Sequence, residues 1–274
     1  LGRRQLFEFY RQQFTPEGST LILTGDLDTH TARQTVEDAL GDWQGGAAKP
    51  AKPIQSDVPG EPRVILVDRK DAAQTTLRLG HPSIPRTHPD FGALQVLNSL
   101  LGGKFTSRIN LKLREELGIT YGANSSFSTR LGPGPFQVAA DVDSEGAGIG
   151  IREIIGELHR LQDERVDEAE LEDTKSYLLG VFPYPLQRID GLASRLADLG
   201  VANLPDDYFD QQLDVIRAVD PQTLQELAQR HLQPTRLSIV AVGPAEALQP
   251  QLEAFGTVSL TAPTDVISAV DALD

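Results

Sequence analysis

The chain has 274 residues and a formal net charge of −14 at pH 7, and 39% of its residues are hydrophobic. This length suits one large or two small domains, and the charge argues against a general binder of nucleic-acid phosphates. The sequence contains no cysteine, which excludes disulfides and thiolate metal sites and suits the bacterial cytoplasm and periplasm equally. The sequence contains no run of about 18 apolar residues, so no membrane span is predicted.

The first elements predict the end of an α+β unit. Apolar residues at positions 6, 7, 10 and 14 have helical spacing over residues 3–14. The apolar run 20–24 has the length of a strand and is expected to be buried on both faces. Asp28 or Thr29 is expected to begin a helix that ends near Leu40. Residues 45–60 contain three prolines and little periodicity, so they predict a linker and a domain boundary.

The segment after this linker predicts a larger α+β unit over residues 61–256. Strands are expected at 63–68, at 73–80, from 121 onward, at 136–142 and at 237–242. The expected helices are an apolar one at 90–101, a short one at 106–114, and amphipathic ones at about 146–164, 167–180, 187–200, 206–217, 221–231 and 245–255. Residues 257–274 are expected to form a flexible tail.

Two parts of the chain resemble each other. In both, a helix is followed by a proline, a strand, a glycine and a further helix. The spans from the proline to the glycine are Pro16 to Gly25 and Pro234 to Gly243, and they have the same length. This repeat indicates that residues 1–44 are the end of a first α+β unit, because a lone strand with two helices cannot bury its faces. The lack of methionine agrees with a fragment or a processed product. Chance similarity is the alternative, since such runs are common.

The segment 110–123 carries the candidate site. Gly118 stands where a helix end needs a left-handed residue, with Arg114 in the last turn before it and Tyr121 at the start of the next strand. Both side chains donate hydrogen bonds, so together they can hold a peptide carbonyl or stabilise an oxyanion. The alternative is structural, because a cation near a helix C-terminus favours the helix dipole and tyrosine is an ordinary strand residue.

Other chemistry has less support. None of the five histidines has a partner at the spacing of H-x-x-E-H or H-E-x-x-H, so no metal site is predicted in this chain. The acidic run 141–146 has Arg152 where a calcium-binding loop requires glutamate. Gly146, Gly148 and Gly150 match a dinucleotide-binding fingerprint only in part, and nucleotide binding is kept as a third hypothesis. No G-x-S-x-G nucleophile is present.

The runs 74–82, 94–110 and 113–123 resemble the C-terminal half of the pitrilysin/insulinase-type zinc peptidases, a group that includes mitochondrial processing peptidase and bacterial two-subunit peptidases. Residues 9–43 resemble the end of the preceding half, so the resemblance covers about residues 4–256. It implies an α+β, processing-peptidase-like sandwich. Such a fold has a mostly antiparallel sheet with helices packed on one face, here preceded by the tail of a related unit.

The resemblance also implies a function. In this family the zinc-binding half carries H-x-x-E-H, and the other half holds no metal and closes over it around an extended peptide. This chain lacks H-x-x-E-H, so we expect no cofactor in it, zinc on a partner half or subunit, and no activity of the chain alone. A purely structural scaffold subunit is the alternative function.

Residues that match Arg114 and Tyr121 reach the substrate and the tetrahedral intermediate in the family. The resemblance therefore implies catalytic and substrate-binding roles for these two residues. Phe105 is a further candidate for lining the substrate chamber, although packing in the core is the favoured role for its ring.

Overall fold

The computed structural model describes residues 2–47 and 62–263, which divide into two compact units. Among these residues, the first unit comprises 2–47 and 181–208, and the second comprises 62–180 and 209–263. The sequence placed the helix near 187–200 in the second unit, whereas the structure groups it with the first. The linker predicted at 45–60 lies outside the described residues except for 45–47. No helix in the described ranges is long and apolar enough to cross a membrane.

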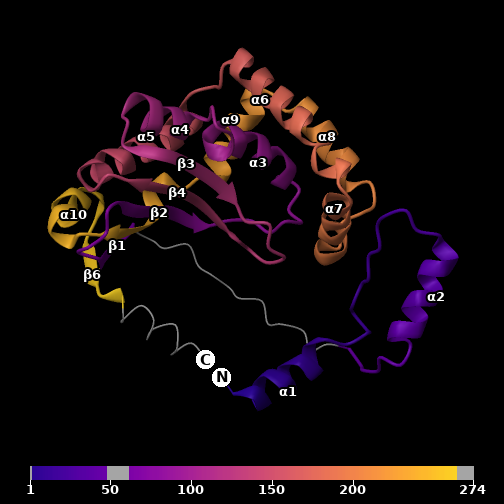
Figure 1. Ribbon diagram of the computed structural model, residues 1–274. Helices are drawn as coiled ribbons and strands as arrows, with labels where there is room; N and C mark the ends of the chain where they lie inside the picture. The colour runs from indigo at the N-terminus through magenta and orange to yellow at the C-terminus, as the bar shows by residue number, and fades with distance from the viewer. Residues whose placement is uncertain (1, 48–61, 264–274) are drawn as a thin grey trace. The chain divides into compact units, whose positions relative to one another are not determined.

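In the described part of the chain, the second unit contains a six-stranded mixed sheet with the strand order β3-β4-β2-β5-β1-β6 (Figure 1). Three pairings are antiparallel, namely β3 with β4, β4 with β2, and β2 with β5. β1 pairs in parallel with β5 and β6, so the expectation of a mostly antiparallel sheet is confirmed. The strands are β1 (Arg63–Asp68), β2 (Thr75–Pro82), β3 (Thr120–Phe127), β4 (Pro135–Val142), β5 (Ser238–Gly243) and β6 (Val258–Thr261).

Helices cover one face of this sheet (Figure 1). They begin and end close to the predicted positions. The helices are α3 (Phe91–Asn98), η1 (Ser99–Gly103), α4 (Arg108–Asn110), η2 (Leu111–Glu116), η3 (Ser144–Gly146), α5 (Ala147–Asp163), α6 (Glu168–Val181), α8 (Tyr208–Ala218), α9 (Pro221–His231), η5 (Pro234–Arg236), α10 (Ala245–Leu252) and η6 (Glu253–Phe255).

The core lies between the sheet and these helices. Burial alternates along β2 and β4, as period-two side-chain geometry requires when one sheet face is covered. Leu77 of β2 and Phe136 of β4 are fully buried, as are Phe91 of α3 and Ile151 of α5. Each buried side chain of this size contributes roughly 1.5–3 kcal/mol by leaving water. The helix layer is therefore held firmly against the strands that position the candidate site.

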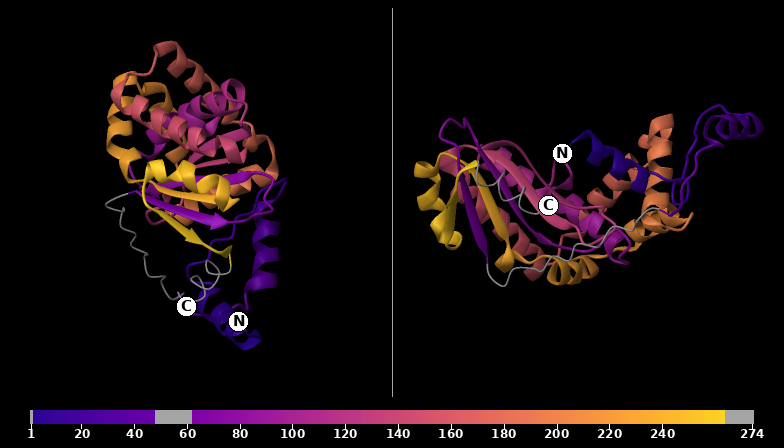
Figure 2. Two further views of the ribbon diagram at one scale, coloured as in Figure 1. Left: turned by 90° about the vertical axis from the view of Figure 1, so that its left-hand side faces the viewer. Right: turned by 90° about the horizontal axis from the view of Figure 1, so that it is seen from below.

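The last strand corrects one expectation. Residues 258–261, predicted as part of a tail, form β6, a yellow strand at the edge of the sheet (Figure 2). This strand pairs with Val64 to Val67 of β1. A short strand without a turn signal before it was not recognisable, because its pairing depends on the exposed edge of β1. The remainder of the expected tail, from 264, lies outside the described residues.

The first unit contains the helices α1 (Arg3–Gln13), α2 (Thr29–Leu40), η4 (Pro185–Gln187) and α7 (Ile189–Ala202). The predicted N-cap of α2 is confirmed, because Oδ2 of Asp28 accepts the amide of Thr31 at 2.7 Å. The strand predicted at 20–24 is wrong for this structure. Leu21 and Leu23 are 55% and 50% exposed, because no described strand pairs with this segment.

Candidate functional site

Gly118 ends the helix that carries Arg114. Its φ angle of +64° lies in the left-handed region, which glycine adopts without steric cost. The amide of Ile119 donates to the carbonyl of Leu113 at 3.1 Å, which satisfies a carbonyl that the last helical turn leaves open. The predicted helix end is confirmed, and it sets the direction in which the chain leaves toward β3.

The helix before this end has an unexpected geometry. α4 continues into η2, whose residues form a wider π-type turn, and η1 has the same geometry. Such turns are rare and occur frequently at functional sites. The apolar pattern of the sequence predicted a helix here but carried no signal of the wider turn.

Arg114 and Phe105 lie against each other. The guanidinium carbon of Arg114 is 4.3 Å from the centroid of the Phe105 ring, a cation–π arrangement, and its Nε lies 3.4 Å from Oε1 of Glu115. The core position favoured for Phe105 is wrong, because its side chain is 64% exposed in the turn between η1 and α4. Stacking uses one face of the guanidinium plane, so its N–H groups can still bind a carbonyl or carboxylate at the edge.

A β-bulge presents Tyr121. The register of β3 against β4 shifts between Thr120 and Ala123, so that Tyr121 and Gly122 share one partner position. The hydroxyl of Thr120 holds this shape, since it donates to the carbonyl of Asp141 at 2.6 Å and accepts the amide of Gly122 at 3.1 Å. Bulges redirect side chains and are common beside active sites. Tyr121 is 90% exposed as a result.

The candidate residues therefore come from three adjacent stretches, a turn, a helix and a strand. The structure brings Phe105 and Arg114 into contact. It places Tyr121 just beyond the helix end, where the phenol makes no hydrogen bond within the described residues. An exposed donor of this kind is free to bind a ligand.

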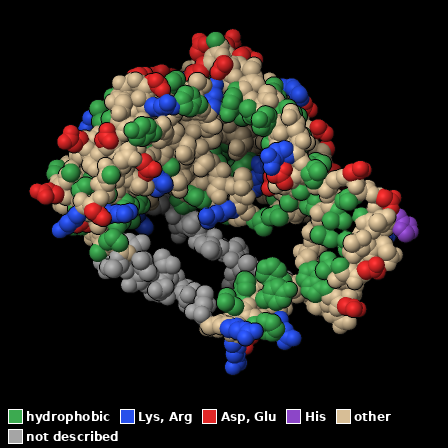
Figure 3. Space-filling view, viewed as in Figure 1, with side chains coloured by type: hydrophobic (Ala, Val, Ile, Leu, Met, Phe, Trp, Pro, Cys, Tyr) green, Lys and Arg blue, Asp and Glu red, His purple; other side chains and the backbone are tan. Residues whose placement is uncertain are grey.

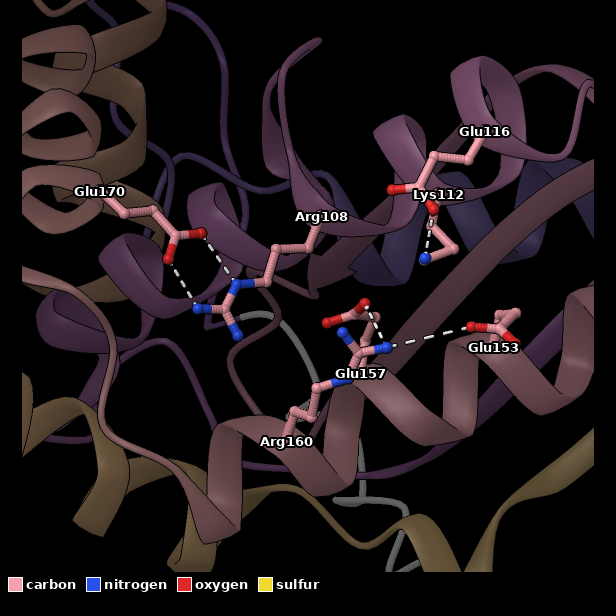
Figure 4. Close-up of polar contacts among 7 residues, drawn as sticks. All are labelled: Arg108, Lys112, Glu116, Glu153, Glu157, Arg160 and Glu170. Atoms are coloured by element: carbon pink, nitrogen blue, oxygen red, sulfur yellow. Dashed lines mark hydrogen bonds and ion pairs between the residues drawn. The ribbon is translucent and has the colours of Figure 1, made fainter.

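Figure 4 shows two ion pairs that involve the helix of the motif, one to α6 and one within the helix itself. The guanidinium of Arg108 donates to both carboxylate oxygens of Glu170, at 2.8 and 2.6 Å, which connects α4 to α6. These hydrogen bonds raise the pKa of Arg108. Lys112 pairs with Glu116 one turn further along the same helix. The two-bond Arg108 pair is geometrically specific, so it fixes the start of the segment that carries Arg114.

Glu157 of α5 lies beside Arg160, between Arg108 and Glu153 (Figure 4). The residue is 3% exposed, and burial raises the pKa of its carboxyl, while Arg160 and Arg108 act in the opposite direction. Nη2 of Arg160 lies 3.0 Å from Oε1, but Oε2 has no hydrogen-bond partner in the described structure. The ionised carboxylate is therefore incompletely satisfied.

A second polar cluster lies at the start of α3. Oδ2 of Asp90 accepts a hydrogen bond from Nη1 of Arg230 at 2.8 Å and lies 2.6 Å from Nε2 of His231. Partial burial raises the pKa of Asp90, but the hydrogen bonds to His231 and Arg230 and the positive charges of these side chains together lower the pKa overall. Nδ1 of His88 accepts the amide of Asp90 at 3.1 Å, and ligand atoms of the two histidines and the aspartate lie within 4.8 Å of one another.

This cluster was missed in the sequence because Asp90 and His231 are 141 positions apart and no local spacing connects them. A divalent cation there would compete with a guanidinium that already binds the carboxylate. The arrangement fits a clamp between α3 and α9 better than a metal centre.

The glycines of the dinucleotide-like run serve packing. A Cβ on Gly146 would lie 2.8 Å from Cγ2 of Ile119, and one on Gly148 would lie 3.0 Å from Cβ of Gln251. The amide of Gly148 donates to Oε1 of Gln251 at 2.9 Å. A phosphate at this helix start would need that amide and that space, so the geometry argues against nucleotide binding.

Comparisons with known proteins identify the family of the chain. The family model described as Peptidase M16 inactive domain matches residues 1–178. An uncharacterized zinc protease of Mycobacterium tuberculosis (strain ATCC 25618 / H37Rv) is 28% identical over 248 residues, which cover 89% of this chain and 56% of that protein. The chain thus spans about half the length of the curated relatives it matches.

Solved structures share the fold. The peptidase M16 inactive domain from Pseudomonas fluorescens aligns with a TM-score of 0.69 and 25% identity, covering 80% of this chain and 52% of that one. A protease from Helicobacter pylori aligns with a TM-score of 0.80 and 18% identity, covering 89% and 60%. Since the family model matches well over half of the sequence, the chain belongs to the M16 peptidase family, and the part matched is the family's inactive domain.

Proposed function

We propose that this chain is the non-metal-binding half of a zinc metalloendopeptidase, and that Arg114 and Tyr121 contact the peptide at a zinc site carried by another segment or subunit. One observation carries the proposal: a β-bulge presents the phenol of Tyr121, 90% exposed, directly after the helix that carries Arg114. The match to an inactive domain and the absence of H-x-x-E-H from the sequence support the placing of zinc elsewhere.

The chemistry divides between the two halves. Zinc on the partner would polarise the attacking water and the scissile carbonyl. The Tyr121 hydroxyl would donate a hydrogen bond to the oxyanion that develops, and the Arg114 guanidinium would hold a backbone carbonyl of the extended peptide. The loss of one such donor costs roughly 3–4 kcal/mol of transition-state stabilisation in a hydrolase, which corresponds to about a 100- to 1000-fold lower kcat.

The first unit supplies the attachment to the partner half. Its α1 and α2 contain no buried residue, and apolar side chains gather on them (Figure 3). An apolar groove of about 710 Å³ is lined by residues including Leu21, Leu23 and Leu196. In the second copy of the repeat, the corresponding strand β5 lies between two other strands. We therefore expect residues 20–24 to become an inner strand of a sheet that the zinc-bearing half completes.

The assembled peptidase, with this chain joined to its zinc-bearing half, provides the test. Tyr121→Phe and Arg114→Ala are each expected to lower kcat for an extended fluorogenic peptide at least 100-fold, without loss of association. Tyr184→Phe is the matched control, because Tyr184 is also highly exposed, at 73%, and has no assigned contact with substrate.

Two outcomes separate the alternatives. If both variants keep full turnover, the assigned roles are wrong. If the assembly forms tightly but hydrolyses no peptide, the chain is a scaffold subunit. Hydrogen exchange at residues 20–24 checks the attachment separately, since these amides should become protected only in the complex.

A further inference from the structure

Asn110 connects all three stretches that carry the candidate residues. Its Nδ2 donates to the carbonyl of Phe105 at 2.6 Å, and its Oδ1 accepts the amide of Ala123 at 3.0 Å. The side chain is 4% exposed. It stands in α4, one turn before Arg114, so a single amide group ties the turn, the helix and the bulged strand together.

The position of these two hydrogen bonds matters more than their number. Phe105 is the residue on which Arg114 stacks, and Ala123 is the first residue that returns to regular pairing after the bulge. Among the described strands β3 lies at the edge of the sheet, so the amide of Ala123 has no second strand there as a hydrogen-bond partner and bonds to the side chain of Asn110 instead. Asn110 supplies that partner from the helix layer and so fixes where the strand leaves the bulge.

We propose that Asn110 is a positioning residue for the peptidase site, which sets the distance between the Arg114–Phe105 pair and the phenol of Tyr121. It touches no substrate itself. The inference rests on the proposed function, because it assigns an effect on turnover to a buried residue. Since a misplacement of about 1 Å can cost about 100-fold in rate, loss of this link should lower kcat while the peptide is still bound.

The test uses Asn110→Leu and Asn110→Asp in the assembled peptidase. Leucine is similar in size and removes both hydrogen bonds; aspartate keeps the acceptor for Ala123 and loses the donor to Phe105. We expect kcat to fall about 10- to 100-fold for Asn110→Leu, with KM within about twofold. Aspartate should recover part of that loss.

The combination with Tyr121→Phe distinguishes positioning from general destabilisation. If Asn110 acts through Tyr121, Asn110→Leu should lower kcat much less in a Tyr121→Phe background than in the wild type. Ser125→Ala is the matched control, since it removes one hydrogen bond between β3 and Asn98 away from the bulge, and should leave kcat unchanged. Full additivity of the two substitutions would overturn the proposal.

A structural measurement keeps this inference separate from the proposed function. In the 274-residue chain alone, Asn110→Leu should speed hydrogen exchange of the Ala123 amide, and Asn110→Asp should not. Unchanged exchange in Asn110→Leu would refute the positioning role even if Tyr121→Phe is inactive. Conversely, faster exchange together with full turnover of Tyr121→Phe would refute the role proposed for Tyr121 and remove the catalytic consequence of the link.

Discussion

Gly118→Ala tests whether left-handed geometry holds the end of the motif helix. No atom lies within 4 Å of the position that a Cβ would take, so the substitution meets no clash and acts through the backbone alone. The left-handed region costs an L-residue roughly 1–2 kcal/mol, and the lower freedom of alanine in the unfolded chain offsets about 0.4–1 kcal/mol. We expect the free energy of unfolding to fall by about 1 kcal/mol.

Gly156→Ala is the matched control. Gly156 stands inside α5, also with no atom within 4 Å, but it is not among the glycines with positive φ. Alanine there should raise the free energy of unfolding by roughly 0.8–1.0 kcal/mol. Urea denaturation followed by circular dichroism measures both changes, and Gly118→Asn should lose less than Gly118→Ala because asparagine tolerates the left-handed region. Equal stabilisation by the two alanine variants would refute the reasoning.

Three further predictions concern the polar clusters. Glu157→Gln should raise the free energy of unfolding by about 1 kcal/mol at neutral pH. Because the pKa of Glu157 is raised in the folded protein, its protonated form favours folding at low pH, and this contribution is lost as the pH rises. The gain from glutamine should therefore shrink toward pH 4, which urea titrations at several pH values would measure. Asp90→Asn should cost about 1.5–3 kcal/mol at neutral pH. Because the pKa of Asp90 is lowered in the folded protein, the ionised carboxylate stabilises the fold at pH values above the pKa of an ordinary aspartate. This stabilisation disappears as the pH falls through the pKa of Asp90 in the folded protein, so an Asp90→Asn variant that is still equally destabilised at pH 2 would contradict the prediction. Arg108→Ala should lower stability by about 1–3 kcal/mol because it leaves Glu170 without its partner; thermal unfolding that matches the wild type would show that the pair contributes nothing.

Most of the fold of the second unit could be predicted because its local signals agree with its tertiary packing. The alternation of apolar and polar residues in β2 and the apolar run of β1 predict which side chains are buried, and the helices have clear amphipathic spacing. Gly118 was recognisable as a helix end because glycine adopts the left-handed conformation that a helix end needs, whatever its neighbours are. The resemblance to the zinc peptidases then supplied the mostly antiparallel character of the sheet, which no local pattern encodes.

Features that depend on distant partners could not be predicted. The run 20–24 has the composition of a buried strand, but a strand exists only where neighbours pair with it, and the described residues offer none. Phe105 has the hydrophobicity of a core residue, yet its ring packs against the guanidinium of Arg114. The two hydrogen bonds of Asn110 and the shift of register at Tyr121 likewise depend on how three separate stretches meet.

The position of β5 has a consequence for synthesis on the ribosome. β1 (Arg63–Asp68) pairs only with β5 and β6 among the described strands, and both are translated long after it, since β5 begins at Ser238. At about 5–20 residues per second, the apolar β1 emerges on the order of ten seconds or more before either partner. The nascent chain therefore keeps β1 unpaired until the residues from 238 onward have emerged, and a stop codon before residue 238 would leave β1 without either of these neighbours.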